Sequence, residues 1–311
     1  MPAHPPIQYL QNHQLDRSAW DACIDRAPNG VLYAYSWYLD AMCTSWDALV
    51  LRNYEAVFPL PYRSKWGIHY LYQPFLTAQL GLFGEGITKD LLLQFLNTIP
   101  PKFKYWDFPL NHGNLFTLET YPLYQRMNYV LDLNKPYEEL YAHFRDNTKR
   151  NIKRSQPYNL QVKKHIPIED VIRLNKEQSL RQQQSFTDTD YNGFRSLFTT
   201  LKDMGRAITY GVYSAQNELM ASVAFLYAHN RAYYLLVGNH PNSRALGASH
   251  RLIDAFIQDH APQHLLLDFE GSDISSLAFF YSSFGASPEP FSAITLNRLP
   301  WYLKWLKNKH H

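Results

Sequence analysis

The chain has 311 residues, of which 46% are hydrophobic and 15% aromatic, and its formal net charge is +3. This length has room for two domains of ordinary size, and the composition is that of a globular protein. A charge excess this small does not by itself indicate a nucleic-acid partner. The two cysteines, Cys23 and Cys43, have no metal-ligand spacing and form no disulfide framework, so we expect a cytoplasmic protein.

No segment is expected to cross a membrane. The N-terminus lacks a basic start followed by an apolar block, and no run approaches the roughly 18 apolar residues that a membrane helix needs. The C-terminal segment 299–311 is aromatic and basic and could rest on a membrane surface. We expect instead that it is a terminal strand or helix that packs Trp301, Leu303 and Trp305 inward.

The first half of the chain alternates helical and strand-like patterns. Helices are predicted within 16–45 and at about 88–98, and strands at 48–52, 56–62, 68–72, 103–108 and 127–133. The glycine-rich stretch Gly81–Gly86 is not followed by Lys-Ser/Thr, so a nucleotide loop is not expected. Asn134-Lys135-Pro136 is a natural boundary, which predicts domains at 1–133 and 134–311.

The second half opens with a helix predicted over 137–155 that is unusually basic. Arg145, Lys149 and Lys153 are spaced by four and would share one helix face, with Arg150 and Arg154 in an adjacent row. This row is either a solvated basic face or the binding surface for a phosphate-bearing partner.

Helices at 169–184 and 190–204 and strands at 208–214, 219–228 and 232–238 are predicted next. A helix at about 247–260 follows the short loop Arg244–Ser249, whose backbone N–H groups could hold a phosphate. A strand at 264–269, a helix at 272–284 and a final strand complete the order.

The strand predicted at 264–269 ends in two acids, Asp268 and Glu270, followed by Gly271 and Ser272. Polar groups that gather where a strand gives way to a helix often build a site, although they can equally cap the next helix. Because side chains alternate along a strand, Asp268 and Glu270 are expected to point to the same side. Two acids there would raise each other's pKa, which suits a general base, or they could bind an ammonium group by charge.

This order of elements resembles the GNAT acyltransferase fold, and in detail the FemAB-like branch, in which two GNAT-type domains stand in tandem. Three motifs carry the resemblance: the basic helix His143–Arg154, the strand end Leu267–Ser272, and the helix end Phe280–Ala286 with its Phe284-Gly285. The resemblance implies an α+β fold (mixed α/β). It implies two GNAT-like domains, each a mostly antiparallel mixed sheet flanked by helices, with a degenerate first domain.

The resemblance also implies transfer of an acyl or aminoacyl group to an amine, such as a cell-wall precursor, an amino sugar or an amino acid. Glu270 and Asp268 are then the candidate bases. Tyr281 falls where GNAT enzymes place a phenol that protonates the leaving thiolate; otherwise it is a buried core tyrosine. The donor would be an acyl-CoA such as acetyl-CoA, held by Arg244, Gly247 and Ser249, or an aminoacyl-tRNA. No metal is expected, because the histidines are scattered without ligand spacing.

The residues expected to bind substrate are Lys149, Arg150, Lys153, Arg154, Tyr72, Gln73, Tyr233 and Ser272. The chain departs from the family pattern because it has no long charged helical arm, and because a serine, Ser249, ends the phosphate loop. A second hypothesis is therefore a catalytically silent tandem-GNAT protein that binds an anionic ligand or a partner. A third is nucleic-acid binding through residues 145–154, which the small net charge disfavours.

Overall fold

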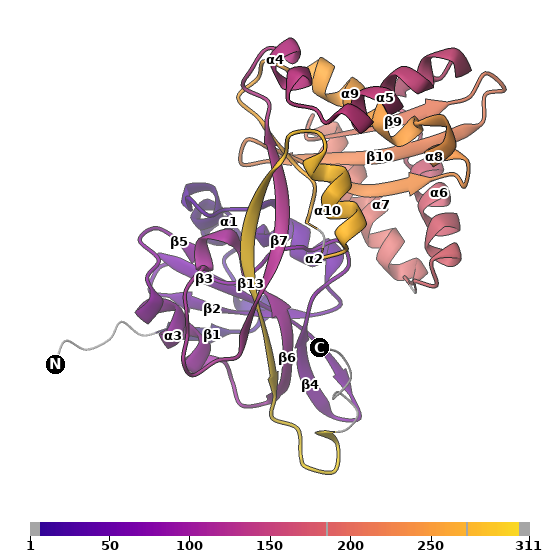
Figure 1. The fold of residues 1–311 in the computed structure, drawn as a ribbon. Coiled ribbons are helices and arrows are strands. Elements are labelled where there is room, and N and C mark those ends of the chain that lie inside the picture. The colour runs from indigo at the N-terminus through magenta and orange to yellow at the C-terminus, as the bar shows by residue number, and fades with distance from the viewer. Residues whose placement is uncertain (1–6, 185, 272, 305–311) are drawn as a thin grey trace. The chain divides into compact units, whose positions relative to one another are not determined.

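The computed structural model describes residues 7–184, 186–271 and 273–304, and it shows the mixed α+β fold that was expected (Figure 1). The chain forms two compact units, the first from Met1–Arg126 with Pro290–His311 and the second from Met127–Glu289. The chain passes from one unit to the other inside two long strands, β7 (Leu123–Asp132) and β13 (Ser287–Asn297). The predicted boundary between residues 133 and 134 differs from these two points of passage. The tandem of two GNAT-like domains stays a prediction.

The first unit is a twisted sheet flanked by helices. Its strands lie in the order β1 (Ile7–Leu10), β2 (Trp46–Leu51), β3 (Ala56–Lys65), β4 (Ile68–Tyr72), β6 (Phe103–Pro109) and β13, with β5 (Phe83–Gly84) paired to β3. Its α-helices are α1 (Arg17–Arg26), α2 (Ser36–Met42) and α3 (Lys89–Thr98). Neighbouring strands are antiparallel except β4 and β6, which are parallel. Phe58, Phe95 and Trp106 lie in its core.

The second unit is another mixed sheet. From residue 127 of β7 the strands follow as β12 (Leu266–Asp268), β11 (Arg231–Asn239), β10 (Leu219–Ala228), β9 (Ala207–Tyr213) and β8 (Gln161–Lys164). Its α-helices are α4 (Tyr137–Ala142), α5 (Asp146–Ser155), α6 (Ile168–Arg181), α7 (Asp188–Asp203), α8 (Ser243–Leu246), α9 (Ala248–His260) and α10 (Ser275–Ser282). Only β11 and β12 run parallel among these neighbouring pairs in the described chain.

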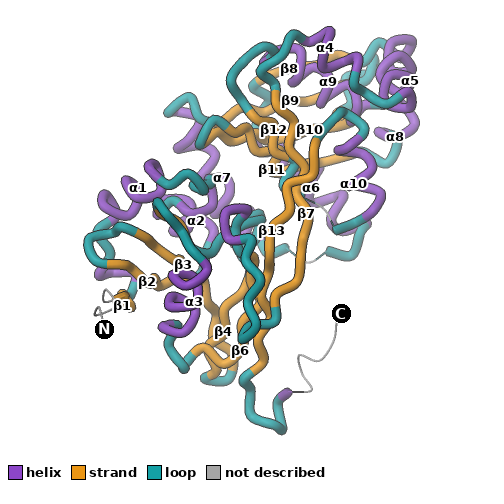
Figure 2. Tube along the Cα trace, turned by 60° about the vertical axis from the view of Figure 1, so that its left-hand side comes forward, coloured by secondary structure: helices purple, strands orange, loops and turns teal. Residues whose placement is uncertain are grey.

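Helices cover both faces of this second sheet. Figure 2 shows α9 on one face and α6 on the other, in keeping with the contacts of α9 and α6 with β10. The core on the α9 side includes Phe225, Tyr234 and Phe256, and the rings of Phe225 and Phe256 stack 3.8 Å apart. An apolar layer on each face is what keeps a sheet of near-continuous hydrophobic strands out of water.

The basic helix is shorter than predicted, because the chain bends at Arg145. Arg145 has an extended backbone (φ −65°, ψ 153°) and precedes the first turn of α5. Its backbone N–H donates to the carbonyl of Ser283 at 2.9 Å, which draws the chain out of the helical path between α4 and α5. The expectation that Arg145 shares a helix face with Lys149 and Lys153 is therefore wrong.

The end of the described chain also differs from expectation. Arg298 continues the ladder with its N–H donated to Lys104, and Pro300, which has no N–H to donate, then ends the pairing. Leu299 takes the buried position, while Trp301 is 84% exposed. The expected inward packing is thus wrong for Trp301, and Trp305 lies outside the described residues. In the ranges that the structure describes, no helix is both long and apolar enough to span a bilayer.

Candidate functional site

A turn with an unusual backbone follows β12. The ladder continues one residue beyond the strand, where the N–H of Phe269 donates to Tyr129 at 3.0 Å, and Glu270 and Gly271 then adopt φ values of +67° and +78°. A Cβ atom on Gly271 would lie 2.6 Å from the carbonyl oxygen of Met127, so only glycine fits there. The left-handed backbone costs a residue such as Glu270 about 1 kcal/mol, and such strain is concentrated at functional sites.

The two acids at this strand end have separate environments. Because β12 ends at Asp268 and Glu270 has a left-handed backbone, strand alternation does not extend to Glu270. Strand alternation therefore gives no reason for the two side chains to point to the same side. Asp268 is 2% exposed, whereas Glu270 is only partly buried. Their direct link runs through the backbone, since the N–H of Glu270 donates to Oδ1 of Asp268 at 2.9 Å.

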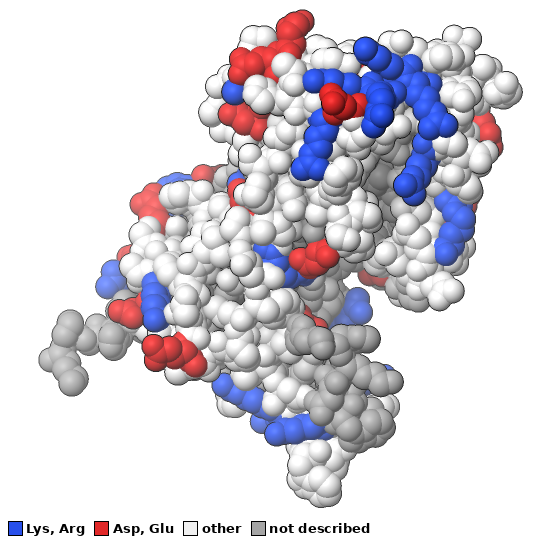
Figure 3. All heavy atoms as spheres, viewed as in Figure 1, with Lys and Arg blue, Asp and Glu red and all other residues white. Residues whose placement is uncertain are grey.

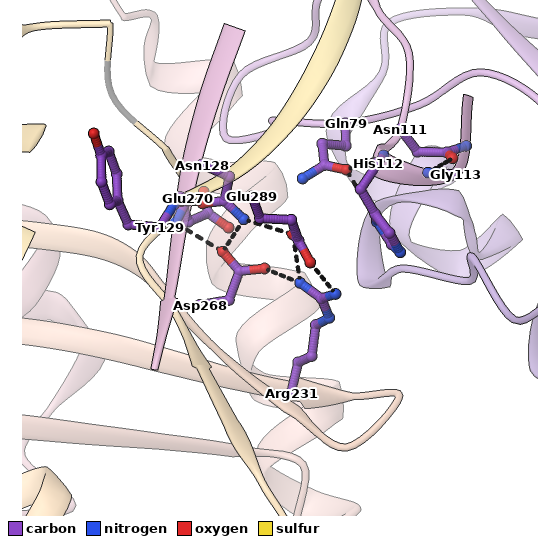
Figure 4. A network of polar contacts seen from close by, with 10 residues as sticks. All are labelled: Gln79, Asn111, His112, Gly113, Asn128, Tyr129, Arg231, Asp268, Glu270 and Glu289. Atoms are coloured by element: carbon purple, nitrogen blue, oxygen red, sulfur yellow. Dashed lines mark hydrogen bonds and ion pairs between the residues drawn. The ribbon is translucent and has the colours of Figure 1, made fainter. Parts of the chain in front are cut away.

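Asp268 belongs to a buried polar network that the sequence did not reveal (Figure 4). Arg231, at the start of β11, places Nη1 2.9 Å from Oδ2 of Asp268. The same guanidinium binds both carboxylate oxygens of Glu289, at 2.9 and 2.7 Å. Asn128 on β7 donates from Nδ2 to Asp268 at 3.0 Å and to Glu289 at 3.1 Å. One guanidinium and one amide thus join two carboxylates, and the network carries an excess negative charge.

Burial and charge act in opposite directions within this network. Burial raises the pKa of Asp268, the charge of Arg231 opposes the rise, and the carboxylate of Glu289 adds to it. Burial alone would lower the pKa of Arg231, but its hydrogen bond to Glu289 and the charge of Asp268 outweigh burial and raise it. Arg231 therefore stays charged, and Asp268 is held in place by donors on several sides. Such a carboxylate is suited to positioning the following turn.

Tyr281, on α10, is buried among aromatic rings. Its ring stacks on Phe269 at 4.7 Å and meets Tyr234 edge-on at 6.3 Å. Burial raises the pKa of Tyr281, and the charge of Glu270 raises it further. The structure thus brings the phenol of Tyr281 within electrostatic reach of Glu270. A raised pKa keeps the phenol protonated at neutral pH and makes it a weaker acid than a free tyrosine, so it can donate a hydrogen bond but cannot act as a base.

The predicted phosphate loop is tightly packed. Gly247 has φ +70°, and a Cβ atom there would lie 2.5 Å from the backbone oxygen of Asn151 on α5. The hydroxyl of Ser249 donates to Oδ1 of Asn239 at 2.6 Å, while Arg244 is exposed. Close packing against α5 is therefore sufficient to explain the glycine. Of the three predicted donor-binding residues, Arg244 is the one with an exposed side chain.

The basic helix lies beside this loop, because Asn151 of α5 touches Gly247. Lys149 donates from Nζ to the carbonyl of Ala142 at 2.9 Å. Arg150, Lys153 and Arg154 are exposed. Figure 3 shows Lys and Arg side chains gathered over α5 and continuing toward α8. The two sets of cations predicted separately from the sequence thus lie on neighbouring elements of one unit.

The remaining predicted substrate residues are dispersed. Tyr72 and Gln73 lie in the first unit, where the Arg63 guanidinium sits 4.4 Å from the Tyr72 ring and Arg126 donates to Gln73 at 2.8 Å. Tyr233, on β11, is fully buried. Ser272 lies outside the described residues. The roles given to these four residues stay predictions.

Two other observations concern binding: a surface hollow and the placement of metal-ligating side chains. A surface hollow of about 600 Å³ lies at α6 and β9, but several of its polar side chains already have partners, as in Arg173 with Asp170 (2.8 Å) and Lys163 with Asn217 (2.9 Å). It contains none of the predicted site residues. No group of three or more His, Cys, Asp or Glu side chains in the described ranges is placed to hold a metal ion.

Known structures resemble this fold. No family model and no curated protein matches the sequence. The crystal structure of FemX superposes with a TM-score of 0.64 at 14% identity, covering 97% of this chain and 100% of the FemX chain. The chain has the FemAB/GNAT-like fold.

Two further structures agree with this FemAB/GNAT-like assignment. The C-terminal domain of a putative lysylphosphatidylglycerol synthetase from Agrobacterium fabrum has a TM-score of 0.57 at 10% identity, with 95% of each chain covered. L-PGS from Bacillus licheniformis has a TM-score of 0.55 at 10% identity, covering 94% of this chain and 95% of its own. The resemblance inferred from the three sequence motifs is confirmed at the level of the fold.

Proposed function

We propose that this FemAB/GNAT-like protein is a transferase that moves an acyl or aminoacyl group to an amine acceptor. The observation that carries the proposal is the likeness to FemX over nearly the whole of both chains. A second neighbour of the same fold is, by its name, the C-terminal domain of a putative lysylphosphatidylglycerol synthetase. The acceptor would be a small-molecule amine, such as an amino acid or amino sugar, or a cell-wall precursor.

The reaction needs a group that accepts a proton. An acceptor amine is an ammonium ion at neutral pH, and it must lose a proton before its nitrogen attacks the donor carbonyl. A C–N bond then forms, and the C–S bond of a thioester or the C–O bond of an aminoacyl ester breaks. Glu270 is our candidate for the base, because its side chain is partly exposed and its backbone is held by Asp268.

Asp268 is a positioning residue in this scheme and not the base. It is almost fully buried, and Arg231, Asn128 and the N–H of Glu270 all donate to it. The network fixes where the turn leaves β12 and therefore where Glu270 lies. Tyr281, which keeps its proton, is the candidate acid for the leaving group.

The donor is proposed from the cations of the second unit. An acyl-CoA would place its phosphates against Arg244 and the start of α9, whereas an aminoacyl-tRNA would use the exposed Arg150, Lys153 and Arg154 on α5. These two sets lie on neighbouring elements. With either donor, we assign the acceptance of the amine proton to Glu270.

A silent binding protein is the alternative function. The observation that favours it is the tight packing of the predicted donor loop, where Gly247 abuts Asn151 and the Ser249 hydroxyl is bonded to Asn239. Tyr281 is likewise enclosed by rings. In this case the basic face of α5 would hold an anionic ligand without turnover.

A turnover assay of the wild type and of Glu270→Gln tests the two functions and the base. The assay mixes the protein with acetyl-CoA or with charged tRNA and a panel of amines, and follows coenzyme A or deacylated tRNA release. We expect Glu270→Gln to reduce turnover about 100-fold or more, as for loss of a general base, while the melting temperature is kept. Glu138→Gln, the same change at an exposed acid of α4, is the matched control and should be fully active. Equal activity of the two variants would remove Glu270 as the base, and no turnover by the wild type with any donor would favour the silent binder.

A further inference from the structure

Three segments far apart in the sequence meet at one end of the sheet in the first unit. The hairpin between β3 and β4 closes at Lys65 paired with Ile68. The start of β4 lies beside the start of β6, with His69 opposite Phe103. The chain leaving β13 pairs there as well, since Arg298 donates its N–H to Lys104. We call this set, residues 63–67, 102–104 and 298–304, the aromatic–basic end; Figures 1 and 2 show it at the lower edge of the first unit.

The aromatic–basic end exposes large rings to solvent. Trp66, at the hairpin tip, is 73% exposed, and Trp301 and Tyr302 are 84% and 56% exposed. Bare indole rings at turn tips are unfavourable in water, because their apolar surface is not covered by the protein. Their exposure therefore indicates a partner with an apolar interior.

The three segments of the aromatic–basic end all carry cations, and acids are absent from them. Lys65, Lys104, Arg298 and Lys304 are all exposed. The sequences of residues 63–67, 102–104 and 298–304 contain no Asp or Glu. Lys65 holds its ammonium 4.7 Å from the Trp66 ring, so charge and apolar surface lie side by side.

We infer that the aromatic–basic end docks on the surface of an anionic lipid bilayer. Trp and Tyr prefer the boundary between headgroups and acyl chains, where one side of the ring is apolar and the other is wet. Lys and Arg beside them are attracted to anionic headgroups. The rings enter the boundary and the cations remain at the headgroups, so that the first unit attaches the protein to the bilayer surface.

The geometry favours lipid over nucleic acid as the partner. Single-stranded nucleic acid binds in a charged groove that follows its backbone. The aromatic–basic end is instead made of turns and strand ends, and its exposed cations are spread over three segments. The exposed rings on these turns can enter a deformable bilayer together.

Vesicle sedimentation tests the inference with the full-length protein. The probes are phosphatidylcholine vesicles with and without roughly 30% phosphatidylglycerol, at low and high salt. We expect binding only to the anionic vesicles. Trp66→Ala with Trp301→Ala should weaken it about tenfold or more, and Lys65→Gln with Lys104→Gln about fivefold for each lysine. The matched control is Leu180→Ala with Lys202→Gln, which alters an exposed leucine and an exposed lysine of the second unit and should bind as the wild type.

Two results would overturn the inference. One is equal sedimentation of the wild type and of both variants of the aromatic–basic end with anionic vesicles. The other is loss of binding to bulk tRNA in these variants with vesicle binding unchanged, which would assign the surface to nucleic acid. Tryptophan emission gives an independent readout, because it should shift to shorter wavelength with anionic vesicles and lose this shift in the double tryptophan variant. The substituted side chains are exposed, so near-ultraviolet circular dichroism should show that the fold is kept.

Discussion

The backbone N–H of Glu270 donates a hydrogen bond to Oδ1 of Asp268, with 2.9 Å between nitrogen and oxygen. Oδ2 of the same carboxylate accepts from Arg231. The position of the turn after β12 therefore depends on a buried ion pair as well as on the strand. A substitution of Arg231 should therefore alter the position of Glu270.

Arg231→Met should destabilise the second unit by about 3–5 kcal/mol, because it leaves the carboxylates of Asp268 and Glu289 without their counter-charge. Urea unfolding followed by circular dichroism measures the change. Arg173→Met is the matched control, since Arg173 pairs with Asp170 on the surface and its loss should cost about 1 kcal/mol or less. Equal effects of the two substitutions would contradict a special role for the buried network.

The Arg231→Met variant should also respond differently to pH. Burial and Glu289 already raise the pKa of Asp268 in the wild type, and loss of the arginine removes the charge that opposes this rise. A raised folded-state pKa means that the folded variant binds protons that the unfolded chain has released. The loss of unfolding free energy in the variant, relative to the wild type, should therefore become smaller as the pH falls from 8 toward 5. Urea unfolding across this range measures it. A loss that is the same at every pH would argue against unpaired carboxylates.

Gly247→Ala should be more harmful than Gly205→Ala. Both glycines have φ near +70°, so alanine costs about 1–2 kcal/mol at each. At Gly205 the added Cβ meets nothing within 4 Å, whereas at Gly247 it meets the Asn151 oxygen at 2.5 Å. This clash should add about 1–3 kcal/mol. Equal losses in urea unfolding would show that α5 moves away from α9 at little cost.

His250 should make the second unit less stable in mild acid. Burial lowers the pKa of His250 to about 4, against about 6.5 when unfolded. Between these values the unfolded chain binds a proton that the folded chain does not, so stability falls as the pH drops through this window, by up to about 3 kcal/mol. His250→Gln should flatten the profile of unfolding free energy between pH 7 and 4. Some slope should remain, because burial also lowers the pKa of His260. An unchanged profile would contradict the burial of His250.

Tyr281 can be tested for packing and for chemistry separately. Tyr281→Ala removes a ring that stacks on Phe269 and should cost about 3–5 kcal/mol. Tyr281→Phe keeps the ring and should cost about 1 kcal/mol. If the phenol donates the proton to the leaving group, Tyr281→Phe should lower turnover about tenfold or more while the melting temperature changes little. Full activity of Tyr281→Phe would leave the ring with a packing role alone.

Long elements with a clear period could be predicted from the sequence. The helix α7 and the strands β10 and β11 lie close to their expected ranges, since a strand of ten residues or a helix of sixteen repeats its pattern often enough to be recognised. A final strand after the helix at 272–284 was predicted without bounds, and β13 is that strand. Its start could not be located, because Pro288 and Pro290 there disfavour a strand. The break at Arg145 was missed for a different reason: the N–H of Arg145 donates to the carbonyl of Ser283, which lies far along the sequence.

The candidate site was predicted in part. Glu270 and Tyr281 were identified and lie within electrostatic reach of each other. Arg231, Asn128 and Glu289 were missed. An arginine at the start of an apolar strand was the one available signal, because a charge in a buried strand needs a partner.

The amino-acid sequence alone determined the kind and order of most elements and the fold, because helix and strand periods are properties of neighbouring residues. It also located the turn after Asp268. Only the tertiary structure decided what each polar group there does. Asn128 and Asp268 are 140 residues apart in the chain and become partners because β7 pairs with β12. Trp66 and Trp301 likewise lie at the same end of one sheet only because β4, β6 and β13 pair side by side. Contacts of this range leave no local pattern, since they arise when strands from distant parts of the chain pair in one register.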